Sequence, residues 1–114
     1  MKKLIGRKKF NLAVFISGNG SNLNNLIKYS LKKNSKFKIN LVISNNPKAK
    51  GLNFARKFRI KKKIIKFLKN KKFDREIVST LKKNDIDFIC LAGFMKILPK
   101  YFIKIYNGKI INIH

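Results

Sequence analysis

A short stretch near the N-terminus combines a strand-like run, a glycine-rich turn and the start of a helical pattern. An apolar run enters it over residues 12–16, and Leu23, Leu26, Ile27 and Leu31 leave it at helical spacing. The turn between them, residues 17–22, reads Ser-Gly-Asn-Gly-Ser-Asn. Strand–turn–helix connections of this kind point backbone N–H groups and the positive end of a helix dipole at an anion, most often a phosphate. The stretch therefore predicts an α/β fold with an anion site after its first strand.

The turn differs from the two best-known phosphate-binding motifs. No Gly-Lys-Ser/Thr follows it, so it is not a Walker loop, and Leu23 stands where a dinucleotide fingerprint has its third glycine. Gly18 and Gly20 allow close backbone approach, and Ser21 or Asn22 is expected to cap the following helix. A β–α turn that binds nothing is the alternative interpretation.

Length and composition indicate one globular domain. The chain has 114 residues, 45% of them hydrophobic, and no apolar run of it is long enough to cross a bilayer. Residues 1–9 are predicted to be a basic lead-in before the domain. The single cysteine, Cys90, lies in an apolar run and is expected to be a buried small hydrophobe, which fits a reducing, cytoplasmic location.

The net charge of +25 raises the question of a nucleic-acid partner. The lysines are spread through every segment, and aromatic residues such as Phe58 stand at core spacing rather than in an RNA-binding motif. This distribution favours a solvated basic surface. A basic nucleic-acid-binding protein stays as an alternative, and a membrane partner is not expected.

Apolar runs alternate with helical patterns along the whole chain. We predict strands at residues 11–17, 37–44, 62–67, 87–92 and 109–113, and helices at 21–33, 51–58, 73–83 (with Asp74 as cap) and 99–106. Short links between alternating elements are typical of an open, mainly parallel sheet with helices on both faces. The lysine-rich third strand is expected near an edge.

Three polar segments follow strands of this sheet and should meet at its carboxyl edge, where such folds bind ligands. They are residues 18–22, residues 93–98, and Asn112 with His114. Each segment also has an interpretation without a functional role. Asparagine is common at strand ends, terminal histidines are usually inert, and Met95 resembles a packing residue.

Taken together, these segments resemble phosphoribosylglycinamide formyltransferases, the glycinamide ribonucleotide transformylases of purine synthesis. The likeness rests on SGNGSNL at residues 17–23, LAGFMKIL at 91–98 and NIH at 112–114. The last two motifs are shared with other folate-dependent formyltransferases and with formyltetrahydrofolate deformylase, whereas the first points to the ribonucleotide enzyme. The resemblance implies a Rossmann-like formyltransferase N-terminal fold over residues 10–114.

The resemblance also implies roles for individual residues. Gly20, Ser21 and Asn22 would hold the ribonucleotide phosphate, Met95, Lys96, Ile97 and Leu98 would line the 10-formyltetrahydrofolate pocket, Asn112 would contact the formyl group, and His114 would be the catalytic histidine. The implied reaction transfers a formyl group from 10-formyltetrahydrofolate to 5-phosphoribosylglycinamide in de novo purine (IMP) biosynthesis. No metal is expected. A deformylase-type hydrolase is the enzyme alternative.

Two departures from the family pattern bear on activity. The family's folate-contacting arginine corresponds to Asn70, with Lys71 or Lys72 as substitutes, and the family continues past the histidine with an aspartate that tunes it. The chain is therefore expected to be a truncated N-terminal portion: a fragment, a remnant, or one part of a split enzyme that a second chain completes. Alone, it is expected to bind the ribonucleotide phosphate weakly and to transfer formyl groups poorly or not at all.

Overall fold

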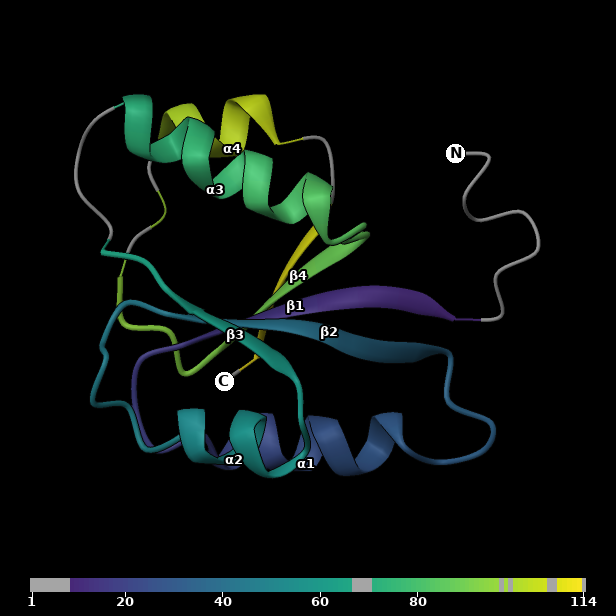
Figure 1. Ribbon diagram of the computed structural model, residues 1–114. Coiled ribbons are helices and arrows are strands. Elements are labelled where there is room, and N and C mark those ends of the chain that lie inside the picture. Colours follow the sequence, from purple (N-terminus) through teal and green to yellow (C-terminus); the bar gives the residue numbers. More distant parts are fainter. Residues whose placement is uncertain (1–8, 67–70, 97, 99, 107–108, 114) are drawn as a thin grey trace.

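A five-stranded parallel sheet forms the centre of the molecule (Figure 1). The computed structural model describes residues 9–66, 71–96, 98, 100–106 and 109–113. In chain order the elements are β1 (Phe10–Ile16), α1 (Ser21–Ser30), β2 (Phe37–Ser44), α2 (Leu52–Lys57), β3 (Lys61–Ile64), α3 (Lys71–Lys83), β4 (Phe88–Ala92), α4 (Lys100–Ile105) and β5 (Lys109–Ile113). The strand order is β3-β2-β1-β4-β5 and every pairing is parallel, as predicted, with the lysine-rich strand at an edge.

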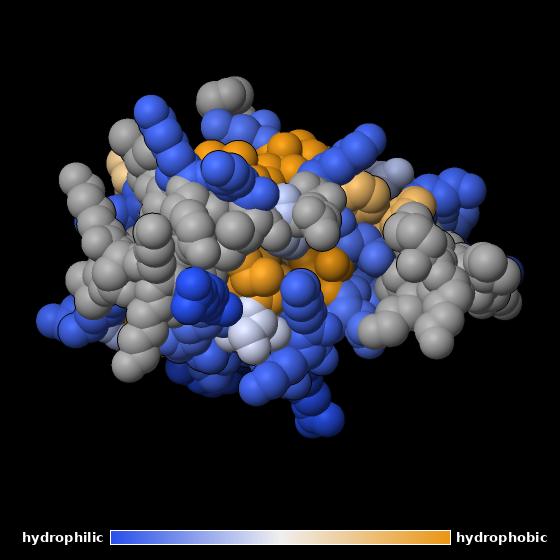
Figure 2. Space-filling model, turned by 90° about the horizontal axis from the view of Figure 1, so that it is seen from above, coloured by the Kyte–Doolittle hydropathy of each residue, from blue (hydrophilic) through white to orange (hydrophobic). Residues whose placement is uncertain are grey.

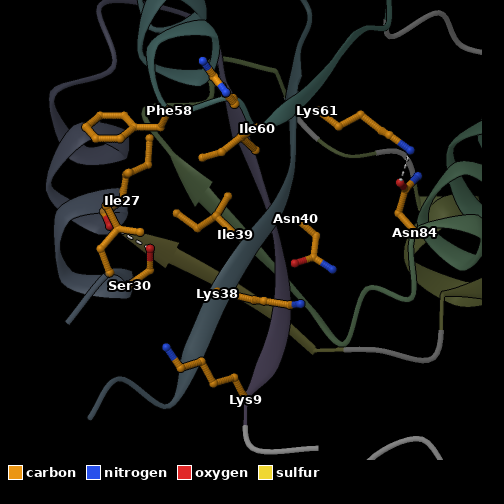
Figure 3. Close-up of a pocket in the computed structure, with 12 residues that line it drawn as sticks. Lys9, Ile27, Ser30, Lys38, Ile39, Asn40, Phe58, Ile60, Lys61 and Asn84 are labelled. Carbon is orange, nitrogen blue, oxygen red and sulfur yellow. Dashed lines mark hydrogen bonds between the residues drawn. The ribbon is translucent and has the colours of Figure 1, made fainter. Parts of the chain in front are cut away.

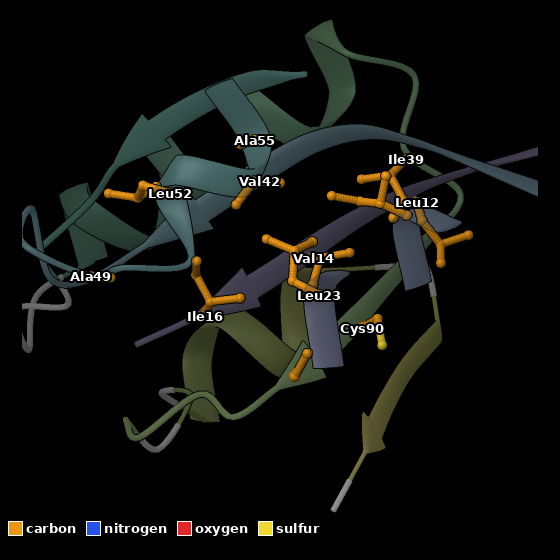
Figure 4. Close-up of a cluster of buried hydrophobic side chains, with 12 residues drawn as sticks. Leu12, Val14, Ile16, Leu23, Ile39, Val42, Ala49, Leu52, Ala55 and Cys90 are labelled. Carbon is orange, nitrogen blue, oxygen red and sulfur yellow. The ribbon is translucent and has the colours of Figure 1, made fainter. Parts of the chain in front are cut away.

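Helices cover both faces of the sheet, with α1 and α2 below it and α3 and α4 above it in Figure 1. Alternate residues of β1 therefore enter two different cores. Val14 and Ile16 pack toward α1 and α2 (Figure 4), whereas Ala13 and Phe15 pack toward α3 and α4. Because both faces are buried, β1 reads as a continuous apolar run rather than an alternating one.

Two predicted helix ends were wrong. Helix α1 ends at Ser30 rather than Lys33, and Leu31, predicted on its buried stripe, is 67% exposed. Helix α3 begins at Lys71, so Asp74 lies inside its first turn and cannot be its cap. The α1 error arises because helical spacing continues beyond the point where the chain turns back toward the sheet. The α3 error has another origin, because the helix starts two residues before Phe73, the first apolar residue of its pattern.

The buried faces of the helices were predicted more accurately than their ends. Ile77, Val78 and Leu81 of α3 are buried as expected, and so is Phe102 of α4. Ile103 was expected to pack as well, but it is 51% exposed because the short helix α4 turns it outward. The predictions for Pro99 and for residues 107–108 lie outside the described residues.

Cys90 confirms its prediction as a buried apolar residue. Its side chain is 2% exposed in the core below the sheet, and burial raises the pKa of its thiol to about 11. Within the described residues, no helix is both long and apolar enough to span a membrane. On the face seen in Figure 2, hydrophilic side chains surround exposed apolar areas.

Tyr106 carries a buried hydroxyl for which the described residues offer no hydrogen-bond partner. Its ring stacks on Phe102 at 5.6 Å, and burial together with the charge of Asp87 raises its pKa to about 12. We expect Tyr106→Phe to leave the free energy of unfolding unchanged or to raise it by about 1 kcal/mol, because a desolvated hydroxyl is removed and no bond to a described residue is lost.

Urea titration at neutral pH measures this change, and a high-pH series gives an independent readout. Since the pKa of Tyr106 is higher in the folded than in the unfolded chain, the folded state holds this proton longer, and its contribution to stability falls as pH rises from about 10 to about 12. The phenylalanine variant lacks this contribution. A loss of more than about 1 kcal/mol at neutral pH would contradict the assignment.

Candidate functional site

A hollow of about 220 Å³ lies at the carboxyl edge of the sheet, between the turn after β1 and the segment after β4. The turn contributes residues 18–22, and the β4 side contributes Ala92, Gly93 and Met95. All three predicted phosphate-binding residues and one of the five predicted folate-binding residues, Met95, therefore line the same space. Among the described residues no acidic side chain lines it, so no described carboxylate opposes an anion there.

Backbone conformation in the turn depends on Gly20. This residue has φ 80° and ψ 21°, in the left-handed region, and it is the N-cap of α1 without a side-chain capping bond. The prediction that Ser21 or Asn22 caps the helix is therefore wrong. Gly20 holds the N-cap position, and the Oδ1 of Asn19, one residue earlier, accepts a hydrogen bond from the Ser21 N–H at 3.1 Å. The amide oxygen of Asn19 thus sits where the helix N-terminus would receive an anion oxygen.

Gly51 packs directly against the turn from the start of α2. A Cβ on Gly20 would lie 2.4 Å from the Gly51 Cα, and one on Gly51 would lie 2.9 Å from the Gly20 Cα. The Gly51 N–H also donates to the Gly18 carbonyl at 3.0 Å. Sequence reasoning missed Gly51, which stands 31 positions after Gly20 with no local motif around it. Its one signal was a glycine at a predicted helix start.

The segment after β4 divides into exposed and buried residues. Met95 is 80% exposed and lines the hollow, Lys96 is exposed, and Leu98 is buried in the core under α3 and α4. Ile97 lies outside the described residues. Phe94 anchors the start of the segment by packing its ring edge-to-face on Phe15 at 5.5 Å.

Asn112 does not line the hollow itself but lies on the neighbouring strand. It pairs with Leu91 and is exposed, and the next residue, Ile113, pairs with Ala92 of the hollow's wall. The end of β5 therefore stands beside the site at the same edge of the sheet. His114 lies outside the described residues.

A second, larger hollow of about 530 Å³ lies elsewhere on the molecule (Figure 3). Lys9, Lys38, Arg59 and Lys61 line it around an apolar floor that includes Ile39, and Lys61 donates to the Asn84 amide oxygen at 3.0 Å. None of the predicted site residues that the structure describes belongs to it. The smaller hollow, which gathers the predicted residues, is therefore the candidate site.

Comparison with known proteins identifies the family. The family model described as formyl transferase matches residues 10–114. The chain belongs to the formyl transferase family. The human trifunctional purine biosynthetic protein adenosine-3 is 44% identical to it over 95% of the chain, and the phosphoribosylglycinamide formyltransferase of Bacillus subtilis is 36% identical over 94%.

Solved structures of formyl transferases share the fold. A phosphoribosylglycinamide formyltransferase from Brucella melitensis superposes with a TM-score of 0.86 at 34% identity and covers 94% of this chain. One from Anaplasma phagocytophilum gives a TM-score of 0.77 at 44% identity, also over 94%. This chain spans 57% and 50% of those two chains, 55% of the Bacillus subtilis protein and 11% of the human protein.

Proposed function

We propose that the protein transfers a formyl group from 10-formyltetrahydrofolate to the amine of 5-phosphoribosylglycinamide, in de novo purine (IMP) biosynthesis. The observation that carries this proposal is the hollow in which the turn after β1 faces the segment after β4. Family membership and the activity named for the Bacillus subtilis relative support it. We further propose that residues 10–114 are the ribonucleotide-binding N-terminal domain of a cytoplasmic enzyme.

In this proposal, Gly20, Ser21 and Asn22 hold the substrate phosphate. The left-handed backbone at Gly20 allows a close approach, and the first N–H groups of α1 carry the positive end of the helix dipole. Phosphate binding would displace the Asn19 amide oxygen from the Ser21 N–H, with one charge-assisted bond replacing a neutral one.

The folate would lie along the segment after β4. Exposed Met95 and Lys96 would contact it, and buried Leu98 would hold the segment against the core. Ile97 belongs to the same proposed contact. Lys71 or Lys72, at the start of α3, would replace the family's arginine, which corresponds to Asn70 here.

The reaction needs stabilisation of a tetrahedral oxyanion. The substrate amine attacks the formyl carbon, a C–N bond forms, the bond to folate N10 breaks, and the amine proton passes to N10. Asn112 would donate from its side-chain amide to the oxyanion, and His114 would donate as imidazolium and move the proton. Since solved relatives run to about twice this length, we propose that further polypeptide, in this chain or a second one, completes both pockets.

Calorimetry with 5-phosphoribosylglycinamide tests the binding half of the proposal. We expect weak, saturable binding of the ribonucleotide and none of the same compound without its phosphate, because the phosphate supplies the charge that α1 attracts. Equal binding of both compounds would refute a phosphate site at this turn.

Product analysis tests the reaction, with the full-length Bacillus subtilis relative assayed in parallel. We expect formylated ribonucleotide to appear far more slowly with this chain than with the relative, because this chain spans 55% of it. Formate release without ribonucleotide would indicate a hydrolase instead, and strongly salt-dependent binding to nucleic acid would indicate the nucleic-acid alternative.

A further inference from the structure

The Ser17 hydroxyl joins the ends of three strands. Ser17 follows β1 and is 8% exposed. Its Oγ donates to the Oδ1 of Asn45, just after β2, at 2.5 Å, and accepts the backbone N–H of Met95, after β4, at 2.7 Å. The residues so connected are separated by 28 and 78 positions in the sequence.

The chemistry of these bonds requires a group that donates and accepts at once. Asn45 presents an oxygen, so the hydroxyl proton must point to it, and a lone pair is then left for the Met95 N–H. Alanine offers neither function, whereas threonine keeps both. In a largely buried position each lost bond would leave a polar group without its partner.

Hydrogen bonds also hold the backbone of Ser17 at the start of the turn. The Ser17 carbonyl accepts from the Asn46 side-chain nitrogen at 3.4 Å, and Asn46 is itself held by the Ser44 hydroxyl, which accepts its backbone N–H at 3.0 Å. These bonds therefore fix the position of the backbone from which residues 18–22 enter the hollow. On the other side of the hollow the Met95 side chain is 80% exposed and does not anchor its own segment.

We propose that Ser17 is a positioning residue that holds the Met95 segment against the anion-binding turn, so that the two walls of the site are set by one hydroxyl. Ser17 does not line the hollow and acts through Met95 and Asn45. Because the bond joins the two walls, an anion that orders the turn should also order the Met95 segment, and the converse should hold with equal strength. The inference rests on the proposed function only for the identity of the anion.

Amide hydrogen exchange of the chain, followed by NMR, tests the positioning role without any activity measurement. We expect Ser17→Ala to accelerate exchange of the Met95 amide by about tenfold or more, since it removes the acceptor of that N–H. Ser17→Thr should restore slow exchange. Asn45→Ala, which frees the hydroxyl without touching Ser17, should accelerate exchange in the same direction and guards against a Ser17→Ala variant that fails to fold.

Ser35→Ala is the matched control, because Ser35 is 5% exposed and its hydroxyl also donates and accepts, to the carbonyl and from the N–H of Phe37. It should lower stability comparably but leave Met95 exchange, measured relative to global unfolding, unchanged. Equal acceleration by Ser17→Ala and Ser35→Ala would overturn the proposal.

A titration with inorganic phosphate separates this proposal from the proposed function. In the unmodified chain, phosphate should shift the amide signals of residues 18–22 and of Met95 together, whereas in Ser17→Ala only those of the turn should shift. Absence of any shift in the unmodified chain would refute the phosphate site, while the exchange comparison would still decide the role of Ser17. A Met95 shift that persists in Ser17→Ala would refute the coupling.

Discussion

Replacing Gly20 with alanine should lower the free energy of unfolding by about 2–4 kcal/mol, since it adds left-handed strain to overpacking. The new Cβ would lie 2.4 Å from the Gly51 Cα, and a backbone atom cannot rotate away as the end of a side chain can. Relief would require α2 to move from the turn. We expect the anion site to be lost with it, because the N–H groups of the turn would no longer point into the hollow.

Gly18→Ala supplies the matched control two positions away. A Cβ at Gly18 meets no atom within 4 Å, and its backbone is not left-handed, so the free energy of unfolding should change by less than about 0.5 kcal/mol. Urea titrations of the two variants, monitored by circular dichroism, measure the difference. Equal stabilities would mean that the turn and α2 do not pack as closely as the structure places them.

Replacing Asn19 with aspartate should change stability and ligand affinity in opposite directions. A carboxylate at the N-terminus of α1 keeps the bond to the Ser21 N–H and interacts favourably with the helix dipole, which should raise the free energy of unfolding by about 0.3–1 kcal/mol. The same charge would stand beside a phosphate bound in the hollow, which Asn19 lines. We expect affinity for 5-phosphoribosylglycinamide to fall by about tenfold to a hundredfold.

The control for this charge is Asn25→Asp, on an exposed position of α1 that does not line the hollow. It changes net charge by the same amount but should leave affinity within about twofold, because screening by salt weakens the longer-range repulsion. Calorimetry in one buffer compares the two variants. If both variants lost affinity equally, ligand affinity would depend on the overall charge of the protein rather than on the charge at the turn.

Local patterns predicted most of the fold. β2 and β5 were predicted with the bounds that the structure has. β2 ends in a buried apolar run, which is typical of a strand covered on both faces, and the polar residues Asn45 and Asn46 follow it. Helix ends were predicted less well. The spacing that predicts Leu31 on a buried face carries no information about where the sheet stops covering that face.

The candidate site also contains residues that local patterns identified and residues that they missed. The turn at residues 18–22 was recognised because its glycines, serine and asparagines are adjacent in the chain and form a strand–turn–helix signal. The hydrogen bond from the Ser21 N–H to Asn19 was overlooked because three other polar residues of the turn offered similar chemistry. Sequence analysis identified Ser17 only as part of a motif. The hydrogen bonds that give it a role reach Asn45 and Met95, which are distant in the sequence.

Alternating apolar runs and helical patterns were enough to establish a parallel α/β sheet and an anion-type turn after its first strand, because both are consequences of neighbouring residues. The contact of Gly20 with Gly51, and the meeting of Ser17, Asn45 and Met95, appeared only in the folded molecule. Strand order places these residues together at one edge of the sheet. Spacing along a chain cannot specify which strands become neighbours, and so it cannot specify which side chains face one another across the site.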